Sequence, residues 1–110
     1  MAGIFAATGQ DLGAVPESSQ ANIGISLRQN GAPGIRAEVV FPSLVVGTVG
    51  GGTGLPTQRE SLQIMDCEGA GKAGRLAQII AAFSLAQDLS IMGALVSNEF
   101  TQAHINFARN

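Results

Sequence analysis

The sequence predicts an α+β fold: a strand pair or hairpin, a long buried helix and a short C-terminal helix. Three observations support this prediction. Apolar residues alternate with small or polar ones over residues 23–27, which is the period of a strand. A second apolar run, suited to a partner strand, covers residues 35–46. Over residues 72–96 the apolar positions follow helical spacing.

The N-terminal stretch, residues 2–15, favours a short buried helix that its glycines weaken. Pro16 is expected to end or kink it, and Ser18 and Ser19 are typical turn residues. After the first strand, Asn-Gly-Ala-Pro-Gly at residues 30–34 is a strong turn signal. The two strands are therefore expected to form a hairpin.

The second strand is expected over residues 35–46, with Pro42 marking an edge strand or a bulge. Glycine then occupies five of the eight positions from 47 to 54. Pro56 suits the first turn of a following helix, which we expect to run to about Met65.

The long helix is predicted over residues 72–96, and Asn98 is expected to begin the last short helix. Apolar residues occupy most faces of the long helix, which is typical of a buried helix. Gln78, Gln87 and Asp88 interrupt its apolar run, so we expect no transmembrane segment.

Composition narrows the classes of function. Charged residues make up 13% of the 110 residues, about half the share of a typical soluble domain. Much of the surface must therefore be apolar, which favours a homo-oligomer subunit or a piece of a larger core. The formal charge of −2 and the scattered basic residues disfavour nucleic-acid binding. A single cysteine, Cys67, excludes an internal disulfide, and no signal-peptide pattern is present, so we expect a cytoplasmic protein.

Three features could carry chemistry. Asp11 follows a Gly-Gln pair within alanine-rich sequence, where it is either a functional acid or a capping or turn aspartate. His104 is the one histidine and could act as a general acid, or it is a surface histidine on a terminal helix. No second histidine or cysteine lies at helical spacing from His104, so we expect no metal site.

The third feature is the glycine loop, defined as residues 47–54. Residues without side chains let a backbone approach a ligand closely, and helix N-termini attract anions. The loop lacks the third glycine of a dinucleotide fingerprint and the Gly-Lys-Ser/Thr of a phosphate-binding loop. The alternative is a tight crossing at which another backbone packs closely.

In their order along the chain, these segments closely resemble class I hydroxymethylglutaryl-coenzyme A (HMG-CoA) reductases. The matching segments are Ala6-Ala7-Thr8-Gly9-Gln10-Asp11, Val46-Gly47-Thr48-Val49-Gly50-Gly51-Gly52-Thr53, Leu55-Pro56-Thr57-Gln58, Gly69-Ala70-Gly71-Lys72-Ala73, Arg75-Leu76-Ala77, Leu85-Ala86-Gln87-Asp88-Leu89-Ser90, Ala103-His104 and Arg109. The resemblance implies that residues 1–110 are the C-terminal segment of the family's large catalytic domain, without its small NADPH-binding insert. The style of the sequence resembles prokaryotic members that have no membrane anchor.

The implied activity is the NADPH-dependent reduction of HMG-CoA to mevalonate and coenzyme A, a step of isoprenoid biosynthesis. In the family a glutamate, a lysine, an aspartate and a histidine form the acid–base set. Asp11 matches the aspartate, and His104 matches the histidine that protonates the departing thiolate. The positions that match the loop near the nicotinamide are Val49, Gly50 and Gly51. The positions on the helix that borders the substrate pocket are Ile91, Ala94 and Leu95.

The sequence also departs from the family. No segment matches the family's glutamate or lysine motif, which implies an N-terminally truncated enzyme that is inactive alone. Pro16 falls where the family has a continuous helix, and Asn98-Glu99 stands where Gly-His is common. Asn110 occupies the position of the regulatory serine of animal enzymes. Two other interpretations stay open: a non-catalytic oligomerisation or interaction module, and a small anion- or nucleotide-binding domain.

Overall fold

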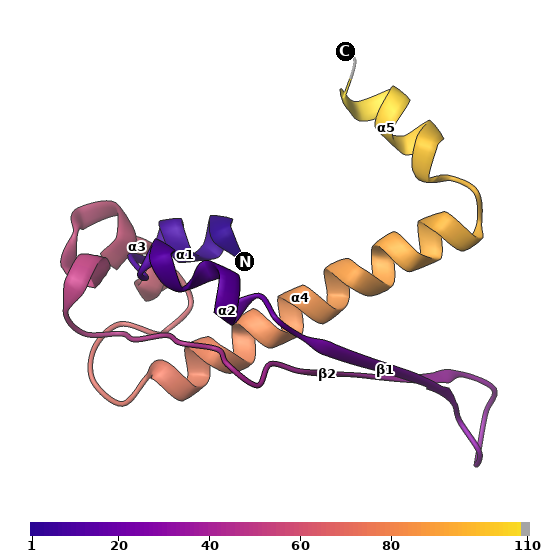
Figure 1. Ribbon diagram of the computed structural model, residues 1–110, viewed down its shortest axis with the longest axis horizontal. Coiled ribbons are helices and arrows are strands. Elements are labelled where there is room, and N and C mark those ends of the chain that lie inside the picture. Colours follow the sequence, from indigo (N-terminus) through magenta and orange to yellow (C-terminus); the bar gives the residue numbers. More distant parts are fainter. Residues whose placement is uncertain (109–110) are drawn as a thin grey trace.

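A computed structural model describes residues 1–108. It contains an N-terminal helical unit, a β-hairpin, a long helix and a short C-terminal helix (Figure 1). The elements are α1 (Ala2–Thr8), η1 (Leu12–Ala14), α2 (Val15–Ser18), β1 (Asn22–Leu27), β2 (Ile35–Val40), η2 (Gly51–Gly54), α3 (Pro56–Ile64), α4 (Ala73–Val96) and α5 (Phe100–Ala108). The predicted α+β class is confirmed, with its hairpin, long helix and short C-terminal helix. Arg109 and Asn110, which the sequence comparison with the family used, lie outside the described residues.

The buried core joins the N-terminal helices to α3 and to the first turns of α4. Its members are Phe5, Ala14, Leu62, Cys67, Leu76 and Ile80. Each large apolar side chain buried in this way contributes about 1.5–3 kcal/mol to folding. Helix α1 packs against α3, so the two segments that flank the glycine loop in space are held by one core.

The hairpin has the predicted antiparallel pairing, with Ile23 opposite Val39 and Leu27 opposite Ile35. The predicted turn closes with the Arg28 amide donating to the Gly34 carbonyl at 2.9 Å. Because side chains alternate between the two faces of a strand, one face of the hairpin holds Ile23, Ile25, Leu27, Ile35, Ala37 and Val39. That face is less covered than predicted, because Leu27 is 79% exposed and the expected half-buried strand stands out from the core.

Strand β2 ends at Val40, six residues earlier than the predicted 46. Pro42 explains the difference, since a proline has no N–H to donate to a strand ladder. The chain turns at Pro42 and Ser43 and reaches the glycine loop as an irregular segment.

Helix α4 has the predicted position, but the prediction that it is buried is wrong for most of its length. Its buried residues are Leu76 and Ile80, both near its N-terminus. Phe83 and Leu95 are exposed further along this fully described helix. By length and composition alone α4 could cross a membrane, so the expectation that the chain has no transmembrane segment stays a prediction.

Two departures from the family pattern have local explanations in the backbone. Pro16 lies in the first turn of α2, after η1 has interrupted the helix, so its missing N–H leaves no helical bond unmade. Asn98 adopts a left-handed conformation, with φ of 62°, immediately after the C-cap of α4. Glycine is the usual residue there and asparagine the next best, so replacing the family's glycine keeps the same turn. Helix α5 starts at Phe100, two residues after the predicted Asn98.

Candidate functional site

The site begins where α1 ends, at the Gly9-Gln10-Asp11 motif. Gly9 caps α1 with φ of 70°, a left-handed conformation that glycine adopts without strain. A Cβ at this position would lie 2.3 Å from the carbonyl carbon and oxygen of Gly52. Gly9 is therefore required twice, for the turn after α1 and for contact with the glycine loop.

Gln10 bonds the motif to the start of the glycine loop. Its Nε2 donates to the Gly47 carbonyl at 2.9 Å and to the Thr8 carbonyl at 3.1 Å. Its Oε1 accepts from the Gly47 amide at 2.8 Å. The side-chain amide thus pairs with the backbone of Gly47 as a strand residue would. No role for Gln10 follows from the sequence alone, although a side-chain amide between a cap glycine and an acid is suited to backbone pairing.

Asp11 lies at the surface and caps η1. Its Oδ1 accepts from the Gly13 amide at 2.8 Å, which confirms the interpretation of Asp11 as a capping or turn aspartate. A capping carboxylate retains lone pairs for a further partner. Lys72 is the chain's one lysine, and its Nζ lies 3.2 Å from Asp66, so it is engaged elsewhere.

The glycine loop combines close packing with bare backbone. Gly52 packs on Gly9, and a Cβ on Gly52 would lie 3.1 Å from the Gly9 carbonyl oxygen, as the alternative of a tight backbone crossing predicts. Gly50 and Gly51 have φ of 78° and 54°, and no described residue lies within 4 Å of a Cβ built on either. These two glycines are needed for conformation, and both are exposed at the surface, where a ligand can approach their backbone. The Thr53 hydroxyl closes the loop by donating to the Gly50 carbonyl at 2.6 Å.

Two hollows border the loop. The first, with a volume of about 460 Å³, brings Asp11 together with the loop and is lined by Ala6, Gly9, Gln10, Asp11, Leu12, Gly51, Gly52, Leu55 and Gln58. The second, of about 360 Å³, is lined by Thr48, Val49, Gly50, Gly51, Thr53, Gly54, Arg59, Glu68 and Gly69. Gly51 contributes to both. Of the predicted cofactor residues, Gly51 therefore shares a hollow with Asp11, whereas Val49 and Gly50 line the second hollow.

Charge in the second hollow comes from Arg59 and Glu68. Glu68 accepts hydrogen bonds from Gln63 and from the Arg59 guanidinium, which hold the pKa of its carboxyl below the ordinary glutamate value. Opposite charges in contact leave this wall nearly neutral, so the loop itself carries no strong field. Such a wall suits an uncharged polar group, such as a carboxamide, better than a phosphate.

His104 lies on α5, which extends from the far end of α4, away from α1, α3 and the glycine loop (Figure 1). Its ring packs on Phe100, with centroids 4.3 Å apart. Its Nδ1 lies 2.9 Å from the Phe100 carbonyl oxygen, which can only accept, so Nδ1 carries a proton and Nε2 is left for exchange. Within this chain His104 is not brought to Asp11. Its position agrees with the alternative interpretation, a surface histidine on a terminal helix.

The predicted substrate-pocket residues lie on the exposed outer half of α4. Ile91 and Leu95 are one turn apart and 38% and 57% exposed, and Ala94 is half-buried beside them. The two hollows at the glycine loop are lined by other residues. The structure therefore groups these three residues on one helix face without joining them to Asp11.

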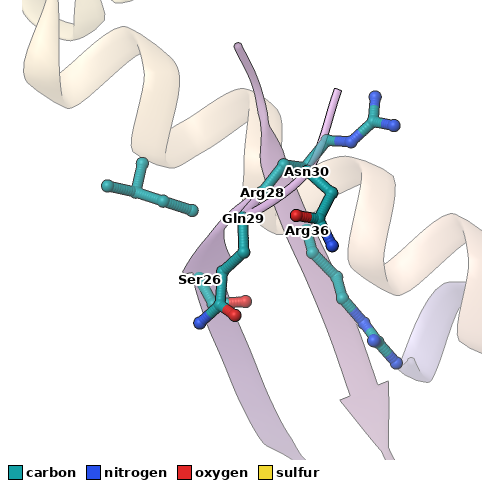
Figure 2. A pocket seen from close by; sticks show the side chains of 6 residues that line it. Ser26, Arg28, Gln29, Asn30 and Arg36 are labelled. Atoms are coloured by element: carbon teal, nitrogen blue, oxygen red, sulfur yellow. The ribbon is translucent and has the colours of Figure 1, made fainter. Parts of the chain in front are cut away.

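A further hollow lies at the tip of the hairpin and is lined by Ser26, Leu27, Arg28, Gln29, Asn30 and Arg36. Figure 2 shows that the guanidinium groups of Arg28 and Arg36 point away from each other and do not converge on a shared centre. Arg36 lies 3.7 Å from Glu38, with both side chains exposed. Diverging cations of this kind do not form an anion site.

Comparison with known proteins connects these features. The model of the hydroxymethylglutaryl-coenzyme A reductase family matches residues 1–109. The chain belongs to the HMG-CoA reductase family. This is a family of oxidoreductases, and the resemblance drawn from the sequence motifs is thereby confirmed.

Curated relatives named 3-hydroxy-3-methylglutaryl-coenzyme A reductase include proteins from archaea and a flatworm. The chain is 40% identical to that of Methanocaldococcus jannaschii over 96% of its own length and 25% of the relative. The corresponding values are 40%, 99% and 27% for Halobacterium salinarum, and 41%, 99% and 11% for Schistosoma mansoni. The chain thus spans about a quarter or less of the length of these HMG-CoA reductases.

Proposed function

We propose that this chain supplies Asp11, His104 and the glycine loop to an NADPH-dependent reduction of HMG-CoA to mevalonate and coenzyme A in the cytoplasm. The observation that carries the proposal is the docking of the Gly9-Gln10-Asp11 motif on the glycine loop, which places Asp11 and Gly51 in one hollow. Residues 1–110 would act as the C-terminal segment of the large catalytic domain. The glutamate and the lysine of the acid–base set would come from reductase sequence outside these 110 residues.

The loop fits the nicotinamide end of a cofactor. Gly50 and Gly51 leave open backbone, and the neutral Arg59–Glu68 wall suits a carboxamide. When bound, the cofactor supplies hydride to the carbonyl carbon, first of the thioester and then of the aldehyde. This chain offers surface for the nicotinamide end, and the remaining cofactor contacts would come from the rest of the reductase.

Asp11 and His104 would then do different work. Asp11, with lone pairs left after capping η1, would hold a lysine ammonium at the carbonyl oxygen, where an alkoxide develops. His104 would protonate the coenzyme A thiolate from Nε2, since Nδ1 bonds to the Phe100 carbonyl. A protonated thiol no longer attacks the aldehyde. Because α5 lies away from the glycine loop, His104 would reach reacting atoms only within the assembled enzyme.

The proposal is tested with the chain alone and with a chimaera in which residues 1–110 replace the matching quarter of the Methanocaldococcus jannaschii reductase. We expect the isolated chain to give no NADPH oxidation with HMG-CoA and the chimaera to be active. Asp11→Asn and His104→Gln should each lower kcat of the chimaera by about 100-fold or more. Glu17→Gln, which changes another exposed acid of the N-terminal unit, should not. A folded but inactive chimaera, or full activity in both site variants, would overturn the proposal.

A second candidate, a non-catalytic oligomerisation or interaction module, is favoured by the exposed apolar face of α4 and the hairpin. Leu27, Phe83 and Val96 are 79%, 67% and 90% exposed, and surfaces of this kind usually bind a partner. Light scattering decides: a stable oligomer of the isolated chain, combined with an inactive chimaera, would favour the module. Tight binding of NADPH or phosphate by the isolated chain would instead favour a small anion- or nucleotide-binding domain.

A further inference from the structure

A network of hydrogen bonds joins the glycine loop to α3 by way of the connection between α3 and α4. The Thr48 hydroxyl, in a side chain only 5% exposed, donates to the Gly69 carbonyl at 2.6 Å. Glu68, next to Gly69, accepts from the Arg59 guanidinium at Oε1 and from Gln63 Nε2 at Oε2, the latter at 2.7 Å. The loop is therefore tied on one side to α3 and on the other, through Gln10, to α1.

The carboxylate is well matched to this position. Arg59 and Gln63 are four residues apart on α3, so they lie one above the other on one face of the helix. Each supplies a donor to a different oxygen of Glu68, and two donors fix the orientation of a carboxylate better than one. The same bonds lower the pKa of Glu68, because both donors favour the charged form of its carboxyl.

This cluster also belongs to the hollow that the loop borders. Arg59, Glu68 and Gly69 line it together with Val49 and Gly51. Gly69 follows Glu68 in the chain and accepts the Thr48 hydrogen bond, and Thr48 lies directly before Val49 and two residues before Gly50.

We propose that Glu68, held by Arg59 and Gln63, is a positioning residue that keeps residues 49–51 in the conformation that binds the nicotinamide cofactor. The proposal rests on the proposed function for its cofactor. Its structural part, the hold of Glu68 on the loop, is a property of this chain and is measured separately.

Glu68→Gln is the informative substitution. A carboxylate accepts at both oxygens, whereas a carboxamide accepts at one and presents N–H groups at the other. The new N–H group can be accommodated only if the Gln63 amide turns over to accept it, and the Arg59 guanidinium loses the negative charge that it now contacts. Side-chain volume is almost unchanged, and the position is partly exposed, so the fold should survive.

Two further variants separate positioning from general damage. The double variant Gln63→Glu with Glu68→Gln exchanges the two side chains. The cluster then again holds one carboxylate and one amide, and Arg59 can still pair with the carboxylate. The double variant should recover most of what Glu68→Gln loses. Glu60→Gln removes an acid from an exposed position on the same helix and serves as the matched control.

The first measurement uses the ¹⁵N-labelled 110-residue chain and backbone order parameters at residues 49–51. We expect values typical of rigid backbone, about 0.85, to fall toward about 0.6 in Glu68→Gln, and to stay high in the control and the double variant. Unchanged order parameters in Glu68→Gln would overturn the proposal whatever the activity of the enzyme.

The second measurement uses the chimaera described above. We expect Glu68→Gln to raise KM for NADPH about three- to fivefold, while KM for HMG-CoA and kcat at saturating NADPH change by less than about twofold. A loosened loop with unchanged KM for NADPH would overturn the role in cofactor binding. An unmodified chimaera that fails to reduce HMG-CoA overturns the proposed function and this cofactor role with it, while the order parameters still decide whether Glu68 holds the loop.

Discussion

The glycine-loop end of the molecule and the hairpin–α5 end differ in how completely residues of this chain pack against them. At the loop, Gly9 packs on Gly52 and Gln10 pairs with Gly47, so local geometry is set within the chain. At the other end, Leu27 and Phe107 are 79% and 87% exposed. The backbone around Asp11 is therefore fixed by contacts within the chain, whereas the end of the molecule that carries His104 leaves large apolar side chains exposed.

The substitution expected to disrupt the glycine-loop end most is Gly9→Ala. The left-handed backbone costs an alanine about 1–2 kcal/mol, and a methyl group 2.3 Å from the Gly52 carbonyl forces the loop to move. We expect the free energy of unfolding to fall by about 3–5 kcal/mol in urea denaturation. Gly3→Ala, also in α1 but with no described residue near its Cβ, should raise it by about 0.5 kcal/mol. Equal effects of the two changes would contradict the close backbone contact.

Two substitutions, Leu76→Ala and Leu95→Ala, compare a buried with an exposed position within helix α4. Leu76 is fully buried, so its truncation should cost about 2–4 kcal/mol in the isolated chain. Leu95 is 57% exposed, and its truncation should cost less than about 0.5 kcal/mol there. In the chimaera we expect Leu95→Ala to cost clearly more, because the rest of the reductase would cover it. The same small cost in both settings would show that no partner covers this end of α4.

What the sequence predicted well was local. The alternation over residues 23–27 and the turn at 30–34 predicted the hairpin, and helical spacing predicted α4. Burial was predicted badly, because apolar residues on every face of a helix do not say whether the covering surface belongs to the same chain. The spacing therefore predicted a buried α4, and the structure exposes most of it.

At the site, the sequence marked Asp11 and the loop as candidates but missed the residue that joins them. Gln10 bonds to Gly47, 37 positions away, and no local pattern reveals a contact at that separation. The network at Glu68 was missed for a related reason, since Glu68 lies in the irregular connection between α3 and α4, where a charged residue is unremarkable. Fold and family followed from the sequence, whereas the contacts that shape the site required coordinates.

Lowering the pH tests the glycine-loop end of the molecule through the titration of Glu68. Its folded-state pKa is lowered, first by the Gln63 hydrogen bond and then by Arg59, so its contribution to stability is present above the ordinary glutamate pKa of about 4.3. That contribution is lost as the pH falls through the lower, folded-state pKa. A carboxyl titration followed by NMR should place the midpoint of Glu68 below the ordinary value. Gln63→Ala should move it upward, and a midpoint that does not respond would show that the bond contributes nothing in solution.

The smallest expected effect tests the junction that carries His104. Asn98 is left-handed, and the Glu99 amide donates to the Ala94 carbonyl at 2.9 Å across this turn. Asn98→Gly should favour the turn by about 0.5 kcal/mol and slow hydrogen exchange of the Glu99 amide about twofold. Asn98→Ala should disfavour it by about 1 kcal/mol and speed exchange about fivefold. If exchange at Glu99 were the same in all three chains, the left-handed turn would not set the direction of α5. The position of His104 would then depend on the rest of the reductase alone.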